Sequence, residues 1–262
     1  MAQADGSGNQ QELLYGLHAV REALRAGTRP LQRILVLRTD RQFSELVQLA
    51  KSKRIPVFIE PQAAFDRLVP VGRHQGVIAF VAAKAYSSTD EILERALHSG
   101  EPPFLIILDG VEDPHNLGAV LRTAEAAGVH GVFIPERRAV GLSSVVAKVS
   151  AGALDHMLVA RVGNISRLIE ELKKADIWIY GIEPSAKKPY TAIDMTGPVA
   201  LIFGGENRGI RAGIEKGCDD CVSILMKGKV ESLNVSAAVA VTVFEAVRQR
   251  EEKGLAPRSS GS

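Results

Sequence analysis

The chain has 262 residues, which is enough for one large domain or two of modest size. Hydrophobic residues make up 46% and charged residues 24% of it, an ordinary globular balance that argues against intrinsic disorder. No apolar run approaches the roughly 18 residues needed to cross a bilayer, and the start of the chain lacks the basic and apolar regions of a signal peptide. We therefore expect a cytoplasmic protein with no membrane partner, and disordered tails at residues 1–11 and 253–262.

The net charge is only +2, so the chain as a whole is not a polycation. The charge is unevenly distributed, because residues 12–83 hold eleven Lys or Arg against six acidic residues, a local net charge of +5. A basic region on a nearly neutral chain suits a polyanion such as RNA. On charge alone, an ordinary solvated surface explains it equally well.

The first block, residues 12–83, alternates between helical and strand patterns. Gly16 precedes a helical stretch that ends at Gly27. The elements that follow are a strand at 34–37, a helix at 43–53, a strand at 55–60, a helix at 61–68 and a strand at 76–83. This order predicts a small α/β domain.

Residues 84–89 break the pattern and are predicted to be a linker. The second block, 90–252, again alternates, and several of its strands are continuous apolar runs, as in a parallel sheet covered on both faces. The predicted helices are 90–98, 116–127, 164–175 and 233–250, and the predicted strands are 104–110, 131–135, 157–162, 177–183, 199–205 and 222–226.

The two cysteines, Cys218 and Cys221, form a single CxxC spacing. A zinc site would need a second such pair or nearby histidines, and a thioredoxin-like redox pair would open a helix after a strand. Neither context is present. We expect two reduced cysteines beside a strand, and no metal.

Three strand ends carry unusual polar or glycine residues, which is where sites form in parallel sheets. After 104–110 come Asn116 and, on the next helix, Arg122. A helix cap would explain Asn116 and a solvated face would explain Arg122, although an arginine there also suits a phosphate.

After 199–205 comes the sequence Gly204-Gly205-Glu206-Asn207-Arg208-Gly209. Glycines here allow a close approach to the backbone, but neither a Rossmann fingerprint nor a P-loop is present. After 222–226 come Ser232 and Asn234, each of which could equally cap the final helix.

Together these segments resemble the SpoU branch of the SPOUT methyltransferases. The motifs match in order as N-x-G-x-x-x-R-x-A (116–124), G-x-E-x-x-G (204–209) and S-L-N (232–234), and residues 15–20 and 74–76 resemble the family's substrate-binding domain. Leu225 departs from the family pattern, which has proline there.

The resemblance implies an α/β fold with a C-terminal trefoil knot, preceded by an L30e/L7Ae-like RNA-binding domain. It further implies a homodimer packed through the knot and helix 233–250. S-adenosylmethionine is the implied cofactor, and it would bind near Gly204, Gly205, Ile224, Met226 and Leu233.

The reaction that the resemblance implies is methyl transfer to a ribose 2′-hydroxyl of structured RNA. Its expected catalytic residues are Asn116, Arg122, Glu206, Ser232 and Asn234. Because a guanidinium is always protonated, Arg122 is predicted to hold a phosphate and stabilise the developing alkoxide rather than act as a base.

Contacts to RNA are expected from His18, Arg21, Arg73, His74 and Gln75. Within the family, the chain looks most like the members that methylate a guanosine in the peptidyl-site loop of 23S rRNA. Two alternatives remain open, the same chemistry on a tRNA D-loop guanosine and a non-catalytic RNA-binding factor for ribosome assembly. A nicotinamide-dependent dehydrogenase is disfavoured by the missing fingerprint.

Overall fold

The computed structural model describes residues 11–69, 74–205 and 209–255. Within these ranges the chain divides into two compact units. Unit 1 comprises residues 1–85 together with 142–156, and unit 2 comprises residues 86–141 together with 157–262. No described helix combines the length and the apolar character that a membrane span requires. The two predicted tails lie almost wholly outside the described residues.

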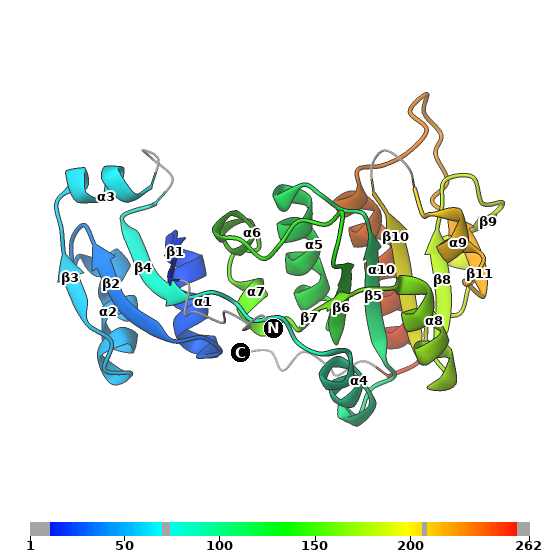
Figure 1. Ribbon diagram of the computed structural model, residues 1–262, viewed down its shortest axis with the longest axis horizontal. Helices are drawn as coiled ribbons and strands as arrows, with labels where there is room; N and C mark the ends of the chain where they lie inside the picture. Colours follow the sequence, from blue (N-terminus) through cyan, green and yellow to red (C-terminus); the bar gives the residue numbers. More distant parts are fainter. Residues whose placement is uncertain (1–10, 70–73, 206–208, 256–262) are drawn as a thin grey trace, which may run out of the picture. The chain divides into compact units, whose positions relative to one another are not determined.

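Unit 1 is built on a four-stranded sheet in the order β1-β4-β2-β3 (Figure 1). Its strands are β1 (Gln11–Tyr15), β2 (Leu31–Val36), β3 (Val57–Ile59) and β4 (Val77–Ala82). Its first three helices are α1 (Leu17–Ala26), α2 (Arg41–Ser52) and α3 (Gln62–Leu68). The central strand β4 is antiparallel to β1 and β2, whereas β2 and β3 are parallel. The predicted alternation of helices and strands is confirmed, with β1 as an addition.

Unit 1 also contains a segment from the middle of the chain, residues 142–156, which lies inside the block 90–252 that the sequence predicts to be continuous. It forms two short helices, α6 (Ser144–Val149) against β1 and α7 (Ala153–His156) against α1. Alternating hydrophobicity cannot show which sheet a short helix packs on, so this return could not be predicted from the pattern.

A buried ion pair holds this segment in unit 1. The guanidinium of Arg29, 3% exposed, lies 2.8 Å from the carboxylate of Asp155, 1% exposed. A second guanidinium nitrogen donates to the same carboxylate at 3.2 Å, and Thr28 and Lys84 donate to the backbone carbonyl of Asp155. Two charges removed from water in this way depend on each other, because neither has access to solvent.

Unit 2 is a seven-stranded, wholly parallel sheet in the order β7-β6-β5-β10-β8-β11-β9. Its strands are β5 (Phe104–Asp109), β6 (Gly131–Pro135), β7 (Val159–Val162), β8 (Trp178–Ile182), β9 (Lys188–Pro189), β10 (Val199–Gly204) and β11 (Asp220–Ser223). Its helices are α4 (Thr89–His98), α5 (Pro114–Ala126), α8 (Ile165–Lys174), the short α9 (Ala212–Glu215) and α10 (Val235–Glu252), with a 3₁₀ turn at Tyr190–Ala192. The predicted parallel α/β sheet is confirmed.

Helices cover the sheet of unit 2, and Figure 1 shows α10 in red behind it. Alternate residues of the central strands point to opposite faces. Leu105 and Ile107 of β5 join the side chains of α4 and α8 in one large core. Helices α5 and α10 pack on each other and against β6 and β10. This burial on both faces explains why the central strands are continuous apolar runs.

The predicted linker, residues 84–89, is ordered where it enters unit 2. Ser87 donates its backbone N–H to Val159 at 2.8 Å and forms a parallel bridge with Ala160. The guanidinium of Arg161 lies 4.3 Å from the ring centre of Tyr86. Ser88 then caps α4, accepting a hydrogen bond from the N–H of Glu91. Ser87 thus pairs with β7 at the edge of the sheet before α4 begins.

Replacing Asp155 with Asn should lower the free energy of unfolding by about 3–5 kcal/mol, because the guanidinium of Arg29 stays buried while its counter-charge is removed. The control is Asp220→Asn, which removes an exposed ion pair with Lys188 and should cost no more than about 1 kcal/mol. Denaturant titration of both variants gives the comparison. Equal losses of unfolding free energy in the two variants would show that the buried ion pair contributes no more to stability than the exposed one.

Candidate active site

The carboxyl ends of the central strands of unit 2 form the candidate site. The chain runs outward through β5, β6 and β7, and then returns so that β8 and β10 lie on the other side of β5. In parallel sheets, ligands bind at the point where the strand order reverses, because the loops there diverge. The loops after β5, β8 and β10, together with the segment between β11 and α10, meet at this point.

Two glycines at the end of β10 allow this convergence. A Cβ atom on Gly204 would lie 2.0 Å from the backbone of Gly209, and one on Gly205 would lie 2.3 Å from the carbonyl oxygen of Gly110. Both distances are far below contact distance, so no side chain fits at either position. The sequence suggests that these glycines let a ligand approach the backbone. In the structure they let the backbone at Gly209 and Gly110 approach.

Two carboxylates hold the residues that follow Gly209. Asp109, at the end of β5, accepts the backbone N–H of Arg211 at 3.0 Å and forms an ion pair with its guanidinium at 2.7 Å. Glu183, just after β8, accepts the backbone N–H of Ile210. The two residues directly after the G-x-E-x-x-G motif are therefore held from the strands on both sides of β10.

Glu183 is a residue that the sequence does not single out, because it lies outside all three motifs. Partial burial raises the pKa of its carboxyl above the usual value, although the hydrogen bond from Ile210 opposes that shift. An acidic residue directly after an apolar strand is the only signal that the sequence offers for it. Asp109 has the same signal and is part of the first predicted loop.

A small, largely apolar cavity of about 120 Å³ lies between β8, β10 and the start of α10, and we call it the apolar cavity. Every residue predicted to bind the cofactor lines it, as does Ser232. These residues are Gly204, Gly205, Ile224, Met226, Leu233 and Ser232. Glu183 and Glu231 are the charged residues in the described part of its lining. The structure therefore brings the second and third motifs together in one place.

Asn116 and Asn234 join the first motif to the third. The side-chain amide of Asn234 donates to the side-chain oxygen of Asn116 at 3.0 Å, and Asn116 is only 7% exposed. Asn234 is also the cap of α10, because its side-chain oxygen accepts the N–H of Ser236 at 2.9 Å. Of the two predicted caps for this helix, Asn234 is correct.

The suggestion that Asn116 caps its own helix is wrong. Asp113 occupies the cap position of α5 and accepts the N–H of His115 at 2.9 Å, with Pro114 as the first helical residue. Proline is favoured there because its missing N–H is not needed. Asn116 consequently lies inside the first turn, where its side chain can reach Asn234.

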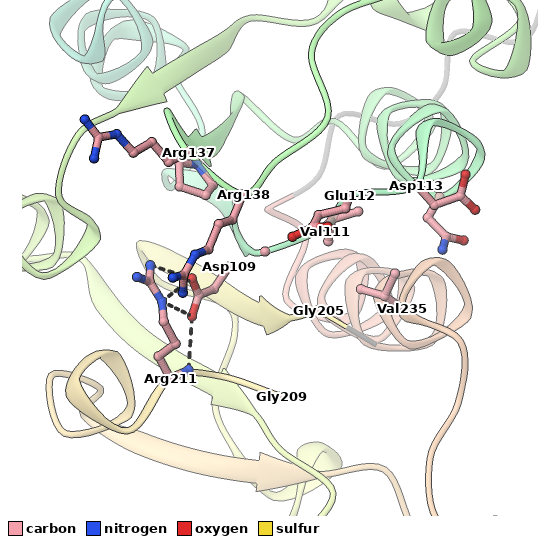
Figure 2. Close-up of a pocket in the computed structure, with 13 residues that line it drawn as sticks. Asp109, Val111, Glu112, Asp113, Arg137, Arg138, Gly205, Gly209, Arg211 and Val235 are labelled. Atoms are coloured by element: carbon pink, nitrogen blue, oxygen red, sulfur yellow. Dashed lines mark hydrogen bonds and ion pairs between the residues drawn. The ribbon is translucent and has the colours of Figure 1, made fainter. Parts of the chain in front are cut away.

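A second, larger cavity of about 470 Å³ adjoins the first, and we call it the polar cavity (Figure 2). Both cavities are lined by Gly205, Gly209 and Val235. The polar cavity also contains Asn116 and a group of charged side chains: Asp109, Glu112, Asp113, Arg137, Arg138 and Arg211. The three arginines of this group could not be identified from the sequence, because they lie outside the recognised motifs.

Two predicted catalytic residues are not placed in these cavities. Glu206 lies outside the described residues. Arg122 is exposed on α5, six residues beyond Asn116, and is not among the described residues that line either cavity of its own chain. Six helical residues correspond to about 9 Å along the axis.

The residues predicted to contact RNA lie in unit 1, apart from Arg73, which falls outside the described residues. His18 and Gln75 line a cavity of about 370 Å³ together with Arg38, which the sequence does not suggest. Gln75 also accepts the N–H of Leu17, at the start of α1. Arg21 lies 3.6 Å from Glu45.

His74 does not lie on the surface. It is 3% exposed, its ring centre lies 5.0 Å from that of Phe65, and its Nδ1 accepts the N–H of Gly76 at 3.0 Å. These contacts give His74 a structural role in shaping the turn before β4.

Both cysteines are free and lie beside β8, at the start of β11. Burial raises the pKa of Cys218 to about 12, and burial also raises the pKa of Cys221. Thiols that remain protonated near neutral pH are poor nucleophiles and poor metal ligands. Their environment agrees with the interpretation that they are two reduced structural cysteines.

Replacing Gly205 with Ala should destabilise unit 2 by about 1–3 kcal/mol, because the new methyl group forces the ends of β5 and β10 apart. The matched control is Gly213→Ala in α9, where an added Cβ meets nothing within 4 Å. That variant should be neutral or slightly stabilising. Chemical denaturation measures both effects. A Gly205→Ala protein as stable as the control would contradict the close approach.

Replacing Glu183 with Gln tests the raised pKa. A carboxyl whose folded pKa exceeds its unfolded value loses stabilising effect as the pH rises through both values. The melting temperature of Glu183→Gln should therefore rise relative to the parent as the pH increases above the ordinary glutamate pKa, and then level off. In the control Glu245→Gln the sign is reversed and the change falls at lower pH, because hydrogen bonds from Arg248 lower the pKa of Glu245. Calorimetry from acidic to neutral pH should show the two opposite trends.

Comparison with known proteins gives a consistent result. The model of the SpoU rRNA Methylase family matches residues 103–244. The model for RNA 2′-O ribose methyltransferase substrate binding matches residues 13–87. The two matches together span most of units 1 and 2, including every motif described above.

Curated relatives align over nearly their full length. YacO of Bacillus subtilis, whose name assigns it to the TrmH family of tRNA/rRNA methyltransferases, is 40% identical, and the alignment covers 94% of this chain and 98% of that protein. The 23S rRNA (guanosine-2′-O-)-methyltransferase RlmB of Yersinia pestis is 39% identical, with coverage of 91% and 98%.

A solved structure shares the fold. The SpoU methyltransferase AviRb from Streptomyces viridochromogenes, in complex with the cofactor AdoMet, matches with a TM-score of 0.77 and 25% identity. The match covers 92% of this chain and 91% of that one. The family models, the curated relatives and this fold agree with the site geometry, and the chain belongs to the SpoU rRNA methylase family of RNA methyltransferases.

Proposed function

We propose that this enzyme transfers the methyl group of S-adenosylmethionine to the 2′-hydroxyl of a guanosine in 23S rRNA. The observation that carries the proposal is the convergence of the three motifs. The hydrogen bond between Asn116 and Asn234 joins the first motif to the third, and the apolar cavity contains residues of the second and third. The relative from Yersinia pestis supports the choice of 23S rRNA.

The apolar cavity fits one part of the methyl donor. Ile224, Met226 and Leu233 offer an apolar slot of the kind that suits an adenine ring, and Glu183 offers a carboxylate for the donor's ammonium group. The cavity alone is small, but it opens into the polar cavity through the residues that they share. Together they reach the size of typical ligand sites, roughly 300–1,000 Å³.

The bound donor supplies an electrophilic methyl group, so the protein must align the ribose hydroxyl with it and offset the charge that develops on the oxygen. We assign the alignment to Asn116, which lines the polar cavity, to Ser232, which lines the apolar cavity, and to Asn234, which donates a hydrogen bond to Asn116. Glu206, which lies outside the described residues, is assigned to orienting the ribose.

We assign Arg122 to a phosphate contact that also stabilises the alkoxide, and we propose that it acts in the cavity of a second protomer. Arg122 is exposed on α5, which packs against α10. Val241 and Phe244, on one side of α10, are 38% and 48% exposed. A homodimer packed through α10 would cover these apolar side chains. A knot through residues 199–235 would fix the loops that form the apolar cavity.

The substrate is tested by incubating the purified protein and labelled S-adenosylmethionine with either 23S rRNA or tRNA, followed by nucleoside analysis. We expect 2′-O-methylguanosine in the rRNA and at least about a hundredfold less in tRNA, since a misplaced acceptor loses the alignment on which the rate depends. The reverse preference would establish the tRNA alternative. Binding of the donor and of both RNAs without any methylation would support the assembly factor.

Arg122→Ala serves as the catalytic control in the same assay. It should abolish transfer and leave the affinity for the donor unchanged, because the side chain is assigned to the RNA phosphate and the alkoxide and not to the donor. Mixed dimers of Arg122→Ala and Asn116→Ala chains should regain activity, because one of the two sites then combines an intact Arg122 with an intact Asn116. Inactive mixed dimers would contradict action across the dimer.

A further inference from the structure

The polar cavity continues into a third hollow on the side away from the apolar cavity. This hollow, of about 740 Å³, lies over the loops after β6 and β7 and the start of α8. Pro135, Arg137, Arg138 and Arg211 line both the polar cavity and the hollow. The apolar cavity, the polar cavity and the hollow therefore form one continuous track across the carboxyl edge of the sheet.

The track becomes more basic with distance from the apolar cavity. In the polar cavity, three arginines face three acids, Asp109, Glu112 and Asp113. In the hollow, the same three arginines remain and Glu136 is the acid in the described lining. The change in charge marks the outer end of the track as a place for an anion.

Arg211 is already engaged, whereas the two arginines after β6 are not. The guanidinium of Arg211 is held by buried Asp109, and Figure 2 shows the dashed contacts between them. Within the described residues, no hydrogen bond or ion pair of the structure engages the guanidinium of Arg137 or Arg138. Figure 2 shows Arg138 pointing toward the Arg211–Asp109 pair and Arg137 pointing away from it.

The backbone of Arg138 adds an independent observation. Its φ angle is +60°, in the left-handed region that non-glycine residues seldom adopt. Asn or Gly would occupy this conformation at lower cost. Residues held in such conformations cluster at functional sites. Here the unusual backbone places two consecutive, exposed arginines at the rim of a cavity.

We infer that Arg137 and Arg138, next to the anchored Arg211, form a binding site for the phosphodiester backbone of the RNA beside the nucleotide to be methylated. The inference rests on the proposed function, because the target ribose must enter the polar cavity to meet the methyl donor. The RNA next to the target nucleotide then runs along the hollow, which continues the track away from the apolar cavity. Arginine suits this task because its planar guanidinium binds two phosphate oxygens at once.

The test is the double variant Arg137→Gln/Arg138→Gln, assayed for binding to in vitro transcribed 23S rRNA over a range of salt concentrations. The affinity should fall on the order of tenfold at moderate salt, and the slope of log K against log salt should decrease by about 0.7–0.9 for each phosphate that the protein no longer neutralises. Under saturating RNA, kcat should remain within about twofold of the parent, because these residues are assigned to binding.

Two single variants sharpen the comparison. Arg138→Gln and Arg137→Gln should each show part of the effect. Lys174→Gln is the matched control, because Lys174 is exposed at the far end of α8 and removing it changes the net charge equally. The control should leave both the affinity and the salt slope unchanged. An equal effect of Lys174→Gln would mean that only the overall charge matters, and would overturn the proposal.

Calorimetry with S-adenosylmethionine alone separates the remaining outcomes. A loss of donor affinity in the double variant, with RNA affinity intact, would assign the arginines to the carboxylate of the donor and overturn the proposal. Unchanged RNA affinity and salt slope would also overturn it. Parent protein that binds RNA through these arginines and yet methylates no RNA would refute the proposed function while leaving the phosphate site in place.

Discussion

The site depends on the contact between the backbone at the end of β10 and the backbone of its neighbours. Gly204 and Gly205 bring the chain so close to Gly209 and Gly110 that no side chain can intervene. Parallel strands normally diverge into separate loops at this edge. Here the loops are drawn together instead, and the apolar and polar cavities are the spaces left on either side of the contact.

Two acids keep this arrangement in place. Asp109 and Glu183 accept the N–H groups of Arg211 and Ile210, which would otherwise be unpaired near the centre of the site. Burial raises the pKa of the Glu183 carboxyl, because the charged form is less well solvated there. We expect this carboxyl to reduce stability near neutral pH while it holds Ile210 in position.

The sheet of unit 2 could be predicted from the sequence because strands buried on both faces are continuous apolar runs, and the motif residues could be predicted because they follow those runs. The cap of α5 was predictable from the sequence, because proline is favoured at the first helical position and Pro114 therefore makes Asp113 the cap and not Asn116. The burial of His74 could not be predicted because its ring contact with Phe65 arises only in the fold. Arg137, Arg138 and Glu183 belong to no motif. Only the cavities connect them with the site, because the two arginines line the polar cavity and Glu183 lines the apolar cavity.

The return of residues 142–156 to unit 1 affects how such a protein could exchange one unit for another by recombination. Unit 1 is not built from one continuous stretch of chain. Residues 142–156 return to it after the chain has entered unit 2, and the chain then ends in unit 2. Fusing a different leading segment would not be enough to acquire a new RNA specificity, since the graft would replace Arg29 and leave the buried Asp155, after α6, without its counter-charge. Recombination would have to replace two separated stretches of the gene together, so the pairing of recognition and catalysis is expected to be inherited as a unit.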